Sequence, residues 1–457
     1  MGFILVILAG LIGANFSTSA DPSKTLMNPG SVRVDARVFS QTRPGASSAT
    51  ASSRICDASR QPGADVGAKV NACGRILGPG TGEIRLTGGG MIATQILLSG
   101  HKLKLVGKGV YSSKVDGPAI VLDNNSTLEC ASWDSILEEG NAPEASPGVA
   151  YSARTGQTVF TIVQSKSGIS GHAGKNERLR VEGCHFRGAR KDFNSAAQTV
   201  SLGNCENCVA RNNWFESVHS IALQAGGTAN SGNSARNILF ENNLFTGSVS
   251  QNLALTNIVG AIVRKNRFIA PGLLGGPGTA VIDVEPNAGD VVDDVLIEDN
   301  LIDATDAPVG PGGPQTNAGI VVNAQSPTRG FRNVRIIANR IIGSPPNAPW
   351  GRISYAGILL RGAPGVLVER NFVQRVNRGI LLDSATTGAI VRGNTLLSCG
   401  SGGTGAIEID DSWNNVVVNN IMGNAPGETV YAEATSRSIK QTGASRNNRI
   451  ESNGPRN

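Results

Sequence analysis

Four charged side chains stand at matched places in neighbouring short segments near the C-terminal end of the sequence. Arg361 ends the segment ILLR, Asp383 ends ILLD, and IEID carries two acids, Glu408 and Asp410. Carboxyl groups held about 5 Å apart push their pKa values apart or share a divalent cation. Cleavage of a glycosidic bond needs such a pair, with one group protonated as acid and the other ionised as base or nucleophile. These four residues are therefore the candidate catalytic group.

The same group also fits a second reaction. In β-elimination from a uronic acid, Arg361 beside carboxylate-bound calcium would neutralise the sugar carboxylate while a base removes the neighbouring proton. Calcium is thus a potential cofactor, and no other is indicated. A structural interpretation stays open as well, because an Arg361–Asp383 surface pair contributes little to stability and Asp410 with Asp411 could cap a turn.

Six further residues are candidates for binding the substrate. Asp283, Glu285 and Asn323 occupy the equivalent outward places in earlier segments. The longest insertions lie just before these segments, in IAPGLLGGPG, DATDAPVGPGGPQTN and GSPPNAPWGRISY, and loops side by side on a rigid scaffold form groove walls. The third insertion supplies groups that could stack on a sugar ring or bind an acid, namely Trp350, Arg352 and Tyr355.

A repeated phrase must position these side chains. The pattern apolar-x-apolar-x-x-Asn-x-apolar recurs in NILFENNLF, VLIEDNLI, VRIIANRI and VLVERNFV, at intervals from 23 residues (Asn243 to Asn266) to 39 (Asn300 to Asn339). Alternation with a period of two indicates strands with the apolar residues inward, and a fixed phrase with variable spacers is typical of a stacked solenoid. We expect the asparagine amides to bond one another in one column, which comprises Asn213, Asn243, Asn266, Asn300, Asn339, Asn371, Asn394, Asn420 and Asn448, with Cys184 at the equivalent place one coil earlier.

The outward residues of this first strand alternate in charge. Opposite charges on neighbouring strands stabilise the pairing by roughly 0.2–1 kcal/mol each, so we interpret them as structural and exclude them from the active site. They stand two residues before each asparagine and comprise Glu182, Arg211, Glu241, Arg264, Glu298, Ile337, Glu369 and Arg392, with the alternation broken at Ile337.

A second short strand lies between successive asparagines, as in AGIVVN, AGILLR, RGILLD and GAIEID. A leucine-rich repeat shares the asparagine phrase but has a helical spacer and a steadier period. Here the spacers are Gly-rich and strand-like, so the sequence predicts an all-β fold, a right-handed parallel β-helix solenoid. The last outward residues of the second strands, in coil order, are expected to be Gly203, Gln224, Thr256, Glu285, Asn323, Arg361, Asp383, Asp410 and Glu433.

The N-terminal end carries targeting features. Residues 1–20 resemble a secretory signal, because a short apolar run precedes the small residues TSA and a cut after Ala20. Residues 21–55 are rich in Ser, Ala, Arg and Pro and are expected to form a flexible leader. A secreted or periplasmic protein is therefore expected, without a membrane-spanning segment after the cut.

An N-terminal cap is predicted over residues 56–80, followed by the β-helix over residues 81–457. Val66, Val70, Cys73 and Leu77 fall on one face of a helix. Such a capping helix can cover the open end of the stack, where inward apolar residues would otherwise meet water.

The seven cysteines suggest one disulfide. Cys56 and Cys73 bracket one short segment, which is a plausible pairing in an exported protein. CENC has the spacing of a zinc or redox pair, but the register places Cys208 inward among apolar residues and no second such pair accompanies it. We therefore expect no metal site there. His185 and His219 are expected on the surface near turns.

The segment GADVGAKVNACGRILGPGTGEIRLTGGG, followed by KLKLVGKG, resembles the N-terminal cap and first coils of the pectate-lyase-like superfamily of β-helix proteins. The asparagine-bearing coils resemble the repeats of that superfamily, so the likeness covers roughly residues 56–450. It implies the fold and leaves the chemistry open, since members include polysaccharide lyases, glycoside hydrolases, esterases, epimerases and non-catalytic adhesins. No Gly-His-Gly or Arg-Ile-Lys phrase of a polygalacturonase is present.

Composition and charge indicate which classes of ligand the protein could bind. The formal charge is +6 with a pI of about 9.0, but the basic residues are scattered, so nucleic acid is not expected. We expect a monomer that takes an oligosaccharide or polysaccharide, preferably acidic, along a groove near residues 283–410. Cleavage by a lyase or hydrolase is the first hypothesis, and a non-catalytic glycan-binding or adhesin-type protein is the alternative.

Overall fold

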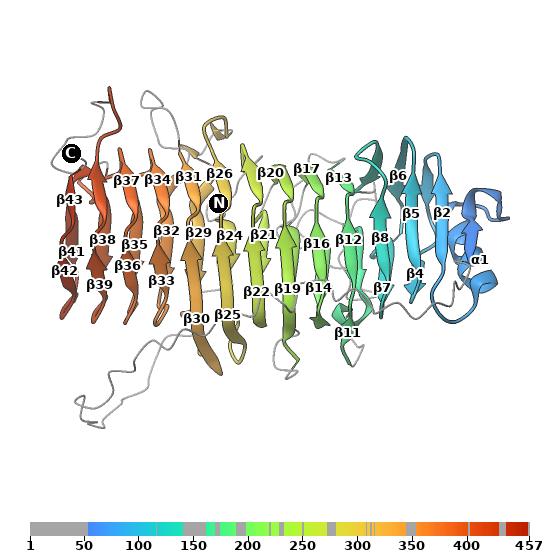
Figure 1. Ribbon diagram of the computed structural model, residues 1–457, viewed down its shortest axis with the longest axis horizontal. Coiled ribbons are helices and arrows are strands. Elements are labelled where there is room, and N and C mark those ends of the chain that lie inside the picture. Colours follow the sequence, from blue (N-terminus) through green and yellow to red (C-terminus); the bar gives the residue numbers. More distant parts are fainter. Residues whose placement is uncertain are drawn as a thin grey trace, which may run out of the picture. The chain divides into compact units, whose positions relative to one another are not determined.

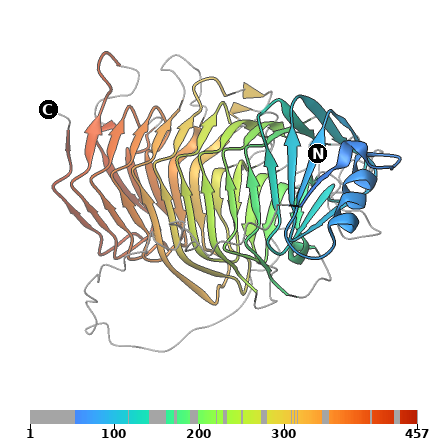
Figure 2. The same ribbon diagram turned by 45° about the vertical axis from the view of Figure 1, so that its right-hand side comes forward.

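The regular structure of the described chain consists almost entirely of short parallel strands. These residues belong to one compact unit, Ser53–Asn457. Each coil adds one strand to each of three sheets, called sheets A, B and C below (Figures 1 and 2). The predicted right-handed parallel β-helix is confirmed. The computed structural model describes residues 54–115, 117–139, 161–169, 174–188, 198–218, 221–227, 233–248, 251–271, 280–307, 309–310, 313–314, 316–343, 353–400, 403–428 and 436–455.

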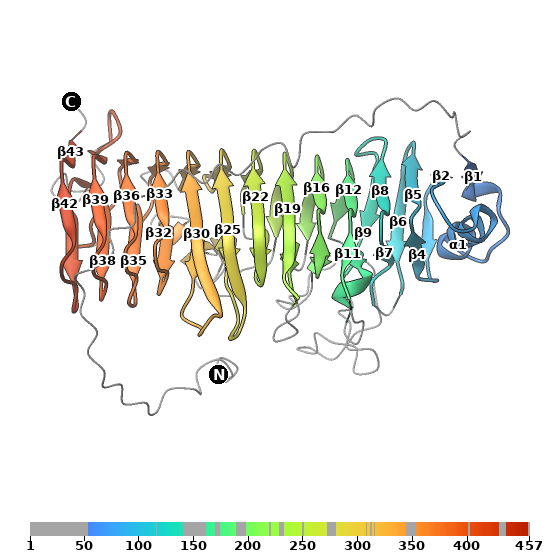
Figure 3. The same ribbon diagram turned by 60° about the horizontal axis from the view of Figure 1, so that its bottom comes forward.

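Sheet A contains the strands that precede the asparagines (Figure 3). Its strands are β1 (Ile55–Asp57), β2 (Glu83–Thr87), β5 (Lys102–Val106), β8 (Thr127–Cys130), β11 (Asn176–Glu177), β12 (Arg180–Glu182), β15 (Cys205–Glu206), β16 (Val209–Arg211), β19 (Ala235–Glu241), β22 (Ile258–Arg264), β25 (Val291–Glu298), β30 (Gly330–Ile337), β33 (Leu367–Glu369), β36 (Ile390–Arg392), β39 (Val416–Val418) and β42 (Arg449–Glu451).

Sheet B contains the strands that follow the asparagines. Its strands are β3 (Gly90–Ile92), β6 (Gly109–Ser113), β9 (Ser135–Glu138), β13 (His185–Arg187), β17 (Trp214–Val218), β20 (Leu244–Ser248), β23 (Arg267–Ile269), β26 (Leu301–Asp303), β31 (Arg340–Ile342), β34 (Phe372–Gln374), β37 (Thr395–Leu397), β40 (Ile421–Gly423) and β43 (Gly454–Pro455).

Sheet C contains the second strands expected from the sequence, and it carries the candidate site. Its strands are β4 (Ile96–Ser99), β7 (Ile120–Asp123), β10 (Val163–Ser165), β14 (Gln198–Gly203), β18 (Ile221–Gly226), β21 (Leu253–Leu255), β24 (Ala280–Val284), β29 (Thr316–Asn323), β32 (Ile353–Arg361), β35 (Ile380–Asp383), β38 (Ile407–Asp410) and β41 (Ile439–Thr442). Two short antiparallel strands, β27 (Val309–Gly310) and β28 (Gly313–Pro314), lie outside the three sheets.

The inward side chains of each coil stack on the side chains at the equivalent positions of the next coil, and together they form a continuous buried apolar core. One stack consists of phenylalanine rings with centroids 4.6–5.1 Å apart. Burying each such ring stabilises the fold by roughly 1.5–3 kcal/mol. The rings belong to Phe186, Phe215, Phe245 and Phe268.

A buried asparagine column joins the coils at the bend between sheets A and B. Asn300 is typical: its Nδ2 donates to Asn339 Oδ1 at 2.9 Å and to the backbone oxygen of Val263 at 2.9 Å. Its Oδ1 accepts from both the backbone nitrogen and Nδ2 of Asn266, each at 3.0 Å. One amide therefore satisfies backbone groups of an adjacent coil that are shielded from water.

The residue before each asparagine of the column has a left-handed backbone, with φ between 52° and 63°. This conformation is uncommon in residues other than glycine, and it turns the chain sharply between sheets A and B. The positions are Asn212, Asn242, Lys265, Asp299, Ala338, Arg370, Gly393, Asn419 and Ser452.

The asparagine column was predicted correctly from Asn213 to Asn420, but its last member is wrong. Asn420 Nδ2 donates to Asn453 Oδ1 at 2.8 Å, and Asn448 instead accepts from Asn415 Nδ2 at 3.1 Å in a second, shorter column. The reason is the register of the last coils, since Val416 pairs with Arg449 and places Asn448 before the strand rather than after it. Cys184 does precede the column, because its backbone nitrogen donates to Asn213 Oδ1 at 3.0 Å.

The outward residues of sheet A also pair as expected. Arg211 contacts Glu182 at 3.0 Å, and Arg264 contacts Glu241 at 2.7 Å. The alternation breaks at Ile337, which lies between Glu298 and Glu369 in the register. Another pair closes the series, from Arg392 Nε to Glu369 Oε1 at 2.9 Å.

The α-helix α1 (Val66–Leu77) covers the first coil, and two short 3₁₀ helices, η2 (Ala58–Arg60) and η3 (Lys166–Gly168), lie between strands. The Asp65 carboxylate caps α1 by accepting from the backbone nitrogens of Gly67 and Ala68. No helix among the described residues is long and apolar enough to span a membrane. Residues 1–53, which include the predicted signal and most of the predicted leader, lie outside the described residues.

Three disulfides hold the N-terminal half together. The predicted Cys56–Cys73 bond joins β1 to α1 and is confirmed. Two further pairs were not anticipated: Cys130–Cys184 connects neighbouring coils, and CENC forms an internal bond between its two cysteines, Cys205 and Cys208.

The asparagine column generates a stability prediction. Replacing Asn300 by Ala leaves the backbone groups of Asn266 and Val263 unpaired inside the stack, so the free energy of unfolding should fall by on the order of 2–4 kcal/mol. Asn453→Ala is the matched control, because Asn453 ends the column and is only half-buried. Chemical denaturation measures both. An equal loss in the two variants would contradict the role of the interior column.

Candidate functional site

The outer face of sheet C presents two columns of side chains. The terminal column contains the last outward residue of each strand, and the central column contains the residue two positions earlier. The pairing of β24, β29, β32, β35, β38 and β41 sets the register. The terminal column reads Glu285, Asn323, Arg361, Asp383, Asp410 and Thr442, and the central column reads Asp283, Val321, Leu359, Leu381, Glu408 and Lys440.

Two members of the expected terminal column are not placed as predicted. Gln224 pairs with Ser201 and Ala254 and therefore lies in the central column, while Gly226 pairs with Gly203. The error arises because β18 extends two residues beyond Gln224. Glu433 lies outside the described residues, and Thr442 is the partner of Asp410.

The structure brings Arg361 and Asp383 together as an ion pair. Arg361 Nε donates to Asp383 Oδ2 at 2.9 Å, and the Ser384 hydroxyl donates to Asp383 Oδ1 at 2.9 Å. The Asp383 side chain is 13% exposed and that of Arg361 is 33% exposed. Each oxygen of the Asp383 carboxyl thus already has a hydrogen-bond donor within the protein.

The other two residues of the predicted catalytic group also have partners. Glu408 Oε2 accepts from Arg378 Nε at 2.8 Å, and the guanidinium of Arg378 lies 4.8 Å from the ring centroid of Tyr355. Asp410 Oδ1 accepts from the Thr442 hydroxyl at 2.7 Å. Arg378 was missed by the sequence analysis because it precedes β35 and is not one of the outward strand residues.

An apolar strip separates this group from the acids earlier in sheet C. Val321, Leu359 and Leu381 of the central column pack together with Tyr355. The predicted substrate-binding residues Trp350 and Arg352 lie outside the described residues.

Asp283 has the strongest electrostatic perturbation on this face. Its side chain is buried, and the residue is only 6% exposed. Gln251 Nε2 donates to Oδ2 at 3.2 Å, whereas Oδ1 has no hydrogen-bond partner among the described residues. Burial, followed by the charge of the neighbouring Glu285, raises the pKa of Asp283 to about 8. The carboxyl is therefore protonated at neutral pH.

Glu285 lies two residues after Asp283 on the same face and is exposed. Its Oε1 accepts from Asn323 Nδ2 at 2.9 Å, so all three residues predicted from this part of the sequence form one group. A protonated acid beside an exposed carboxylate is a pair of the kind that acid–base chemistry requires. The sequence placed both acids on one face, but only the structure shows that one of them is buried.

Two other expectations concern metal ligands and histidines. Among the residues that the structure describes, no three His, Cys, Asp or Glu side chains lie close enough together to bind a metal ion, and the calcium hypothesis remains a prediction. His185 is not a surface residue: it is 4% exposed, stacks on Trp214 at 3.9 Å and contacts Glu216 at 3.0 Å. The neighbouring coil covers it, which strand periodicity alone does not reveal. His219 lies outside the described residues.

A family model described as periplasmic copper-binding protein (NosD) matches residues 314–455. Copper favours imidazole and sulfur ligands. The matched segment contains no histidine, one methionine (Met422) and one cysteine. That cysteine, Cys399, is buried, and burial raises the pKa of its thiol to about 12. The residues present therefore do not fit a copper site.

Solved structures give a broader comparison. Two structures of DFA-IIIase from Arthrobacter chlorophenolicus A6 are 12% and 13% identical to this chain, cover 86% of it and 100% of their own chains, and have TM-scores of 0.52. The A-module of mannuronan C-5 epimerase AlgE6 from Azotobacter vinelandii is 14% identical, covers 88% of this chain and 99% of its own, and has a TM-score of 0.49.

No curated protein was found with significant sequence similarity to the chain. At such low identity the structural likeness establishes the fold alone. Together with the three parallel sheets and the asparagine column, it shows that this chain is a right-handed parallel β-helix.

Proposed function

We propose that this chain is a carbohydrate-active β-helix protein that hydrolyses glycosidic bonds of an oligosaccharide lying along the outer face of sheet C. The observation that carries the proposal is the buried Asp283 carboxyl, with its pKa raised to about 8 and one oxygen without a partner among the described residues, beside the exposed Glu285. A carboxyl that keeps its proton at neutral pH can protonate the oxygen of a leaving sugar.

In this proposal Asp283 is the general acid, and Glu285 is the nucleophile or the base that activates water. Gln251 donates to Oδ2 of Asp283, and a hydrogen bond between the Asp283 and Glu285 side chains connects the buried carboxyl to the exposed one. Asn323 orients Glu285 from the next coil. The catalytic assignment thus moves from Asp383 and its neighbours to residues first predicted to bind substrate.

Arg361, Asp383, Glu408 and Asp410 then line the same face beyond the apolar strip, where they would contact further sugar units. Hydrolysis is favoured over β-elimination because Arg361 is already paired with Asp383 and is therefore less available to neutralise a sugar carboxylate. The acidic substrate expected from the net charge and the calcium requirement are both open to direct test, with uronic and neutral polysaccharides and with a chelator.

Two comparisons support a carbohydrate ligand and an exported protein. One DFA-IIIase structure of the same fold is described as a complex with DFA-III, which sets a precedent for a saccharide bound to a β-helix. The family model that matches residues 314–455 describes a periplasmic protein, in line with the secretory signal expected at residues 1–20.

A non-catalytic glycan-binding protein is the second candidate. It is favoured by the ion pairs of Asp383 and Glu408, because both carboxylates were candidate catalytic groups in the sequence and both are already paired with arginines. Binding of an oligosaccharide without release of reducing ends would support this alternative.

Substitution tests the acid–base assignment. Asp283→Asn and Glu285→Gln should each lower turnover by about 10²–10⁴-fold, since each removes a proton-transfer or nucleophilic group. Release of reducing ends measures hydrolysis, and ultraviolet absorbance of an unsaturated product would reveal a lyase. Asp293→Asn, in the sheet A pair with Arg332, is the control. Full activity of Asp283→Asn together with loss in Asp383→Asn would return the chemistry to the group around Asp383.

The raised pKa of Asp283 gives a pH prediction for activity. The general acid must be protonated, so the rate should fall as the pH rises through about 8. A rate that continued to rise from pH 7 to 9 would contradict the assignment.

The same pKa gives an independent prediction for stability. The unfolded carboxyl, with its ordinary pKa of 3.8, releases a proton that the folded one retains up to about pH 8. The stability contributed by the buried neutral acid is therefore complete below about pH 4 and decreases as the pH rises to about 8. Thermal unfolding between pH 5 and pH 9 should show that Asp283→Asn loses less stability than the parent with rising pH. Parallel curves for the two proteins would show that Asp283 is not a buried, protonated acid.

A further inference from the structure

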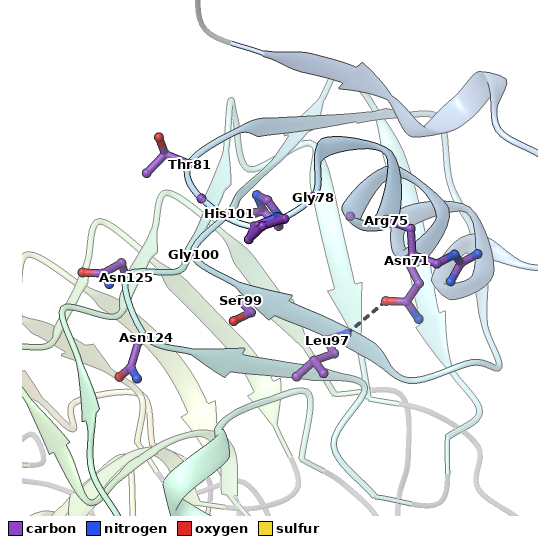
Figure 4. Close-up of a pocket in the computed structure, with 13 residues that line it drawn as sticks. Asn71, Arg75, Gly78, Thr81, Leu97, Ser99, Gly100, His101, Asn124 and Asn125 are labelled. Atoms are coloured by element: carbon purple, nitrogen blue, oxygen red, sulfur yellow. Dashed lines mark hydrogen bonds between the residues drawn. The ribbon is translucent and has the colours of Figure 1, made fainter. Parts of the chain in front are cut away.

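A pocket lies at the N-terminal end of sheet C, between the C-terminal end of α1 and the first coils (Figure 4). Its volume is about 820 Å³. One wall is the loop from Gly78 to Thr81, another is β4 with Leu97 and Ser99, and the turn at Asn124 and Asn125 forms the far side. All residues that line it belong to the described chain, and none of them belongs to the group around Asp283.

His101 is the buried polar group of this pocket. It is 6% exposed, and its Nδ1 has no hydrogen-bond partner among the described residues. Its ring bonds to the backbone of Gly78, while burial first and the charge of Arg54 second lower its pKa. Because its pKa is lowered, the ring is neutral at pH 7, and a neutral imidazole has one nitrogen that accepts a hydrogen bond. Nδ1 is the ring nitrogen without a partner among the described residues, so we assign it as the acceptor for a hydroxyl donor.

The pocket lining carries a positive charge and no negative one. Its lining includes Arg75, which is exposed and has no carboxylate partner in the described structure, and it includes no Asp or Glu. Arg54 does not line the pocket, but it donates to the backbone oxygens of Leu77 and Pro79 at 2.7 and 3.3 Å. The pocket therefore favours a group with negative charge.

The remaining lining groups suit a sugar ring. The side chain of Leu97 is exposed and offers an apolar surface, since the residue is 49% exposed. Ser99, Thr81 and the amides of Asn124 and Asn125 offer donors and acceptors around it. An apolar floor with convergent polar groups is the usual character of a ligand site.

The walls are fixed in place before any ligand arrives. The Asn71 amide accepts from the backbone nitrogen of Leu97 at 3.1 Å (Figure 4). It also donates to the backbone oxygen of Gln95 at 2.8 Å, and the two bonds tie α1 to β4. The Cys56–Cys73 bond ties the same helix to β1. Little ordering is then required on binding, which favours affinity.

The pocket is aligned with the candidate site. Leu97 belongs to the central column, and the register continues coil by coil to Asp283 through Val121, Gln164, Ser201, Gln224 and Ala254. Six steps of about 4.8 Å place the two ends roughly 29 Å apart.

We propose that this pocket is a second saccharide site, which binds a sugar unit that carries a carboxylate. A sugar hydroxyl donates to His101 Nδ1, the carboxylate pairs with Arg75, and the apolar face of the ring packs on Leu97. The site shares its ligand class with the proposed function and none of its residues, so it stands whether or not the chain is an enzyme.

The test is a titration of the full chain carrying Asp283→Asn with a galacturonic acid trisaccharide and, separately, a neutral galactose trisaccharide. The readout is the NMR signal of the His101 ring, one of four histidines in the sequence, together with calorimetry. The acidic sugar should shift this signal and bind more tightly than the neutral one. Arg75→Gln should weaken binding of the acidic sugar about tenfold, because it removes a charge-assisted hydrogen bond. His101→Phe should abolish binding of both.

Arg60→Gln is the control, because Arg60 is 85% exposed and does not line the pocket. Thermal unfolding checks that each variant is folded, and Arg75 is exposed enough for its substitution to leave the fold intact. An unshifted His101 signal at millimolar sugar, or equal affinity of Arg75→Gln and the parent for the acidic sugar, would overturn the proposal. Loss of turnover in Asp283→Asn with binding retained at His101 separates this site from the proposed catalytic one.

Discussion

The structure depends on one recurring interaction, the hydrogen bonds of a buried asparagine amide with the coils on either side. An amide group has both donors and an acceptor, so an identical residue can bond both its neighbours in a stack, which an aspartate or a leucine cannot do. Along the column each amide also serves backbone groups of the adjacent coil. The coils are thereby held at one spacing and in one register, whatever the length of the loops between them.

That register gives the outer face of sheet C its chemistry. Glu285 meets Asn323, and Arg361 meets Asp383, only because their strands are aligned residue for residue. In sequence the members of these pairs are 38 and 22 residues apart. A loop between two coils can lengthen without moving either member of a pair, so new surface groups can be added to the stack while the site keeps its geometry.

Much of the coil register could be predicted from the sequence, because the alternation of apolar and polar residues and the repeated asparagine phrase indicate which residues point inward. The strands that carry Arg361, Asp383 and Glu408 were positioned correctly for that reason. Gln224 was misplaced because β18 continues two residues beyond it. Asn448 was misplaced because β42 begins after it, which moves the last member of the column five residues on, to Asn453. The burial of Asp283 and His185 could not be predicted, because it depends on what covers the outer face and not on the alternation within a strand. The Cys130–Cys184 bond was likewise hidden, since the two residues are 54 positions apart in the sequence and become neighbours only through the coil register.

The cross-links are distributed unevenly along the stack. All three disulfides lie between Cys56 and Cys208, and the one later cysteine, Cys399, is an unpaired buried thiol. Since each coil contacts only its immediate neighbours, a solenoid can unravel from an end. No disulfide joins the described coils after Cys208, so the strands that carry Asp283 and Asp410 are held by hydrogen bonds and packing alone and should open more readily than the cross-linked coils.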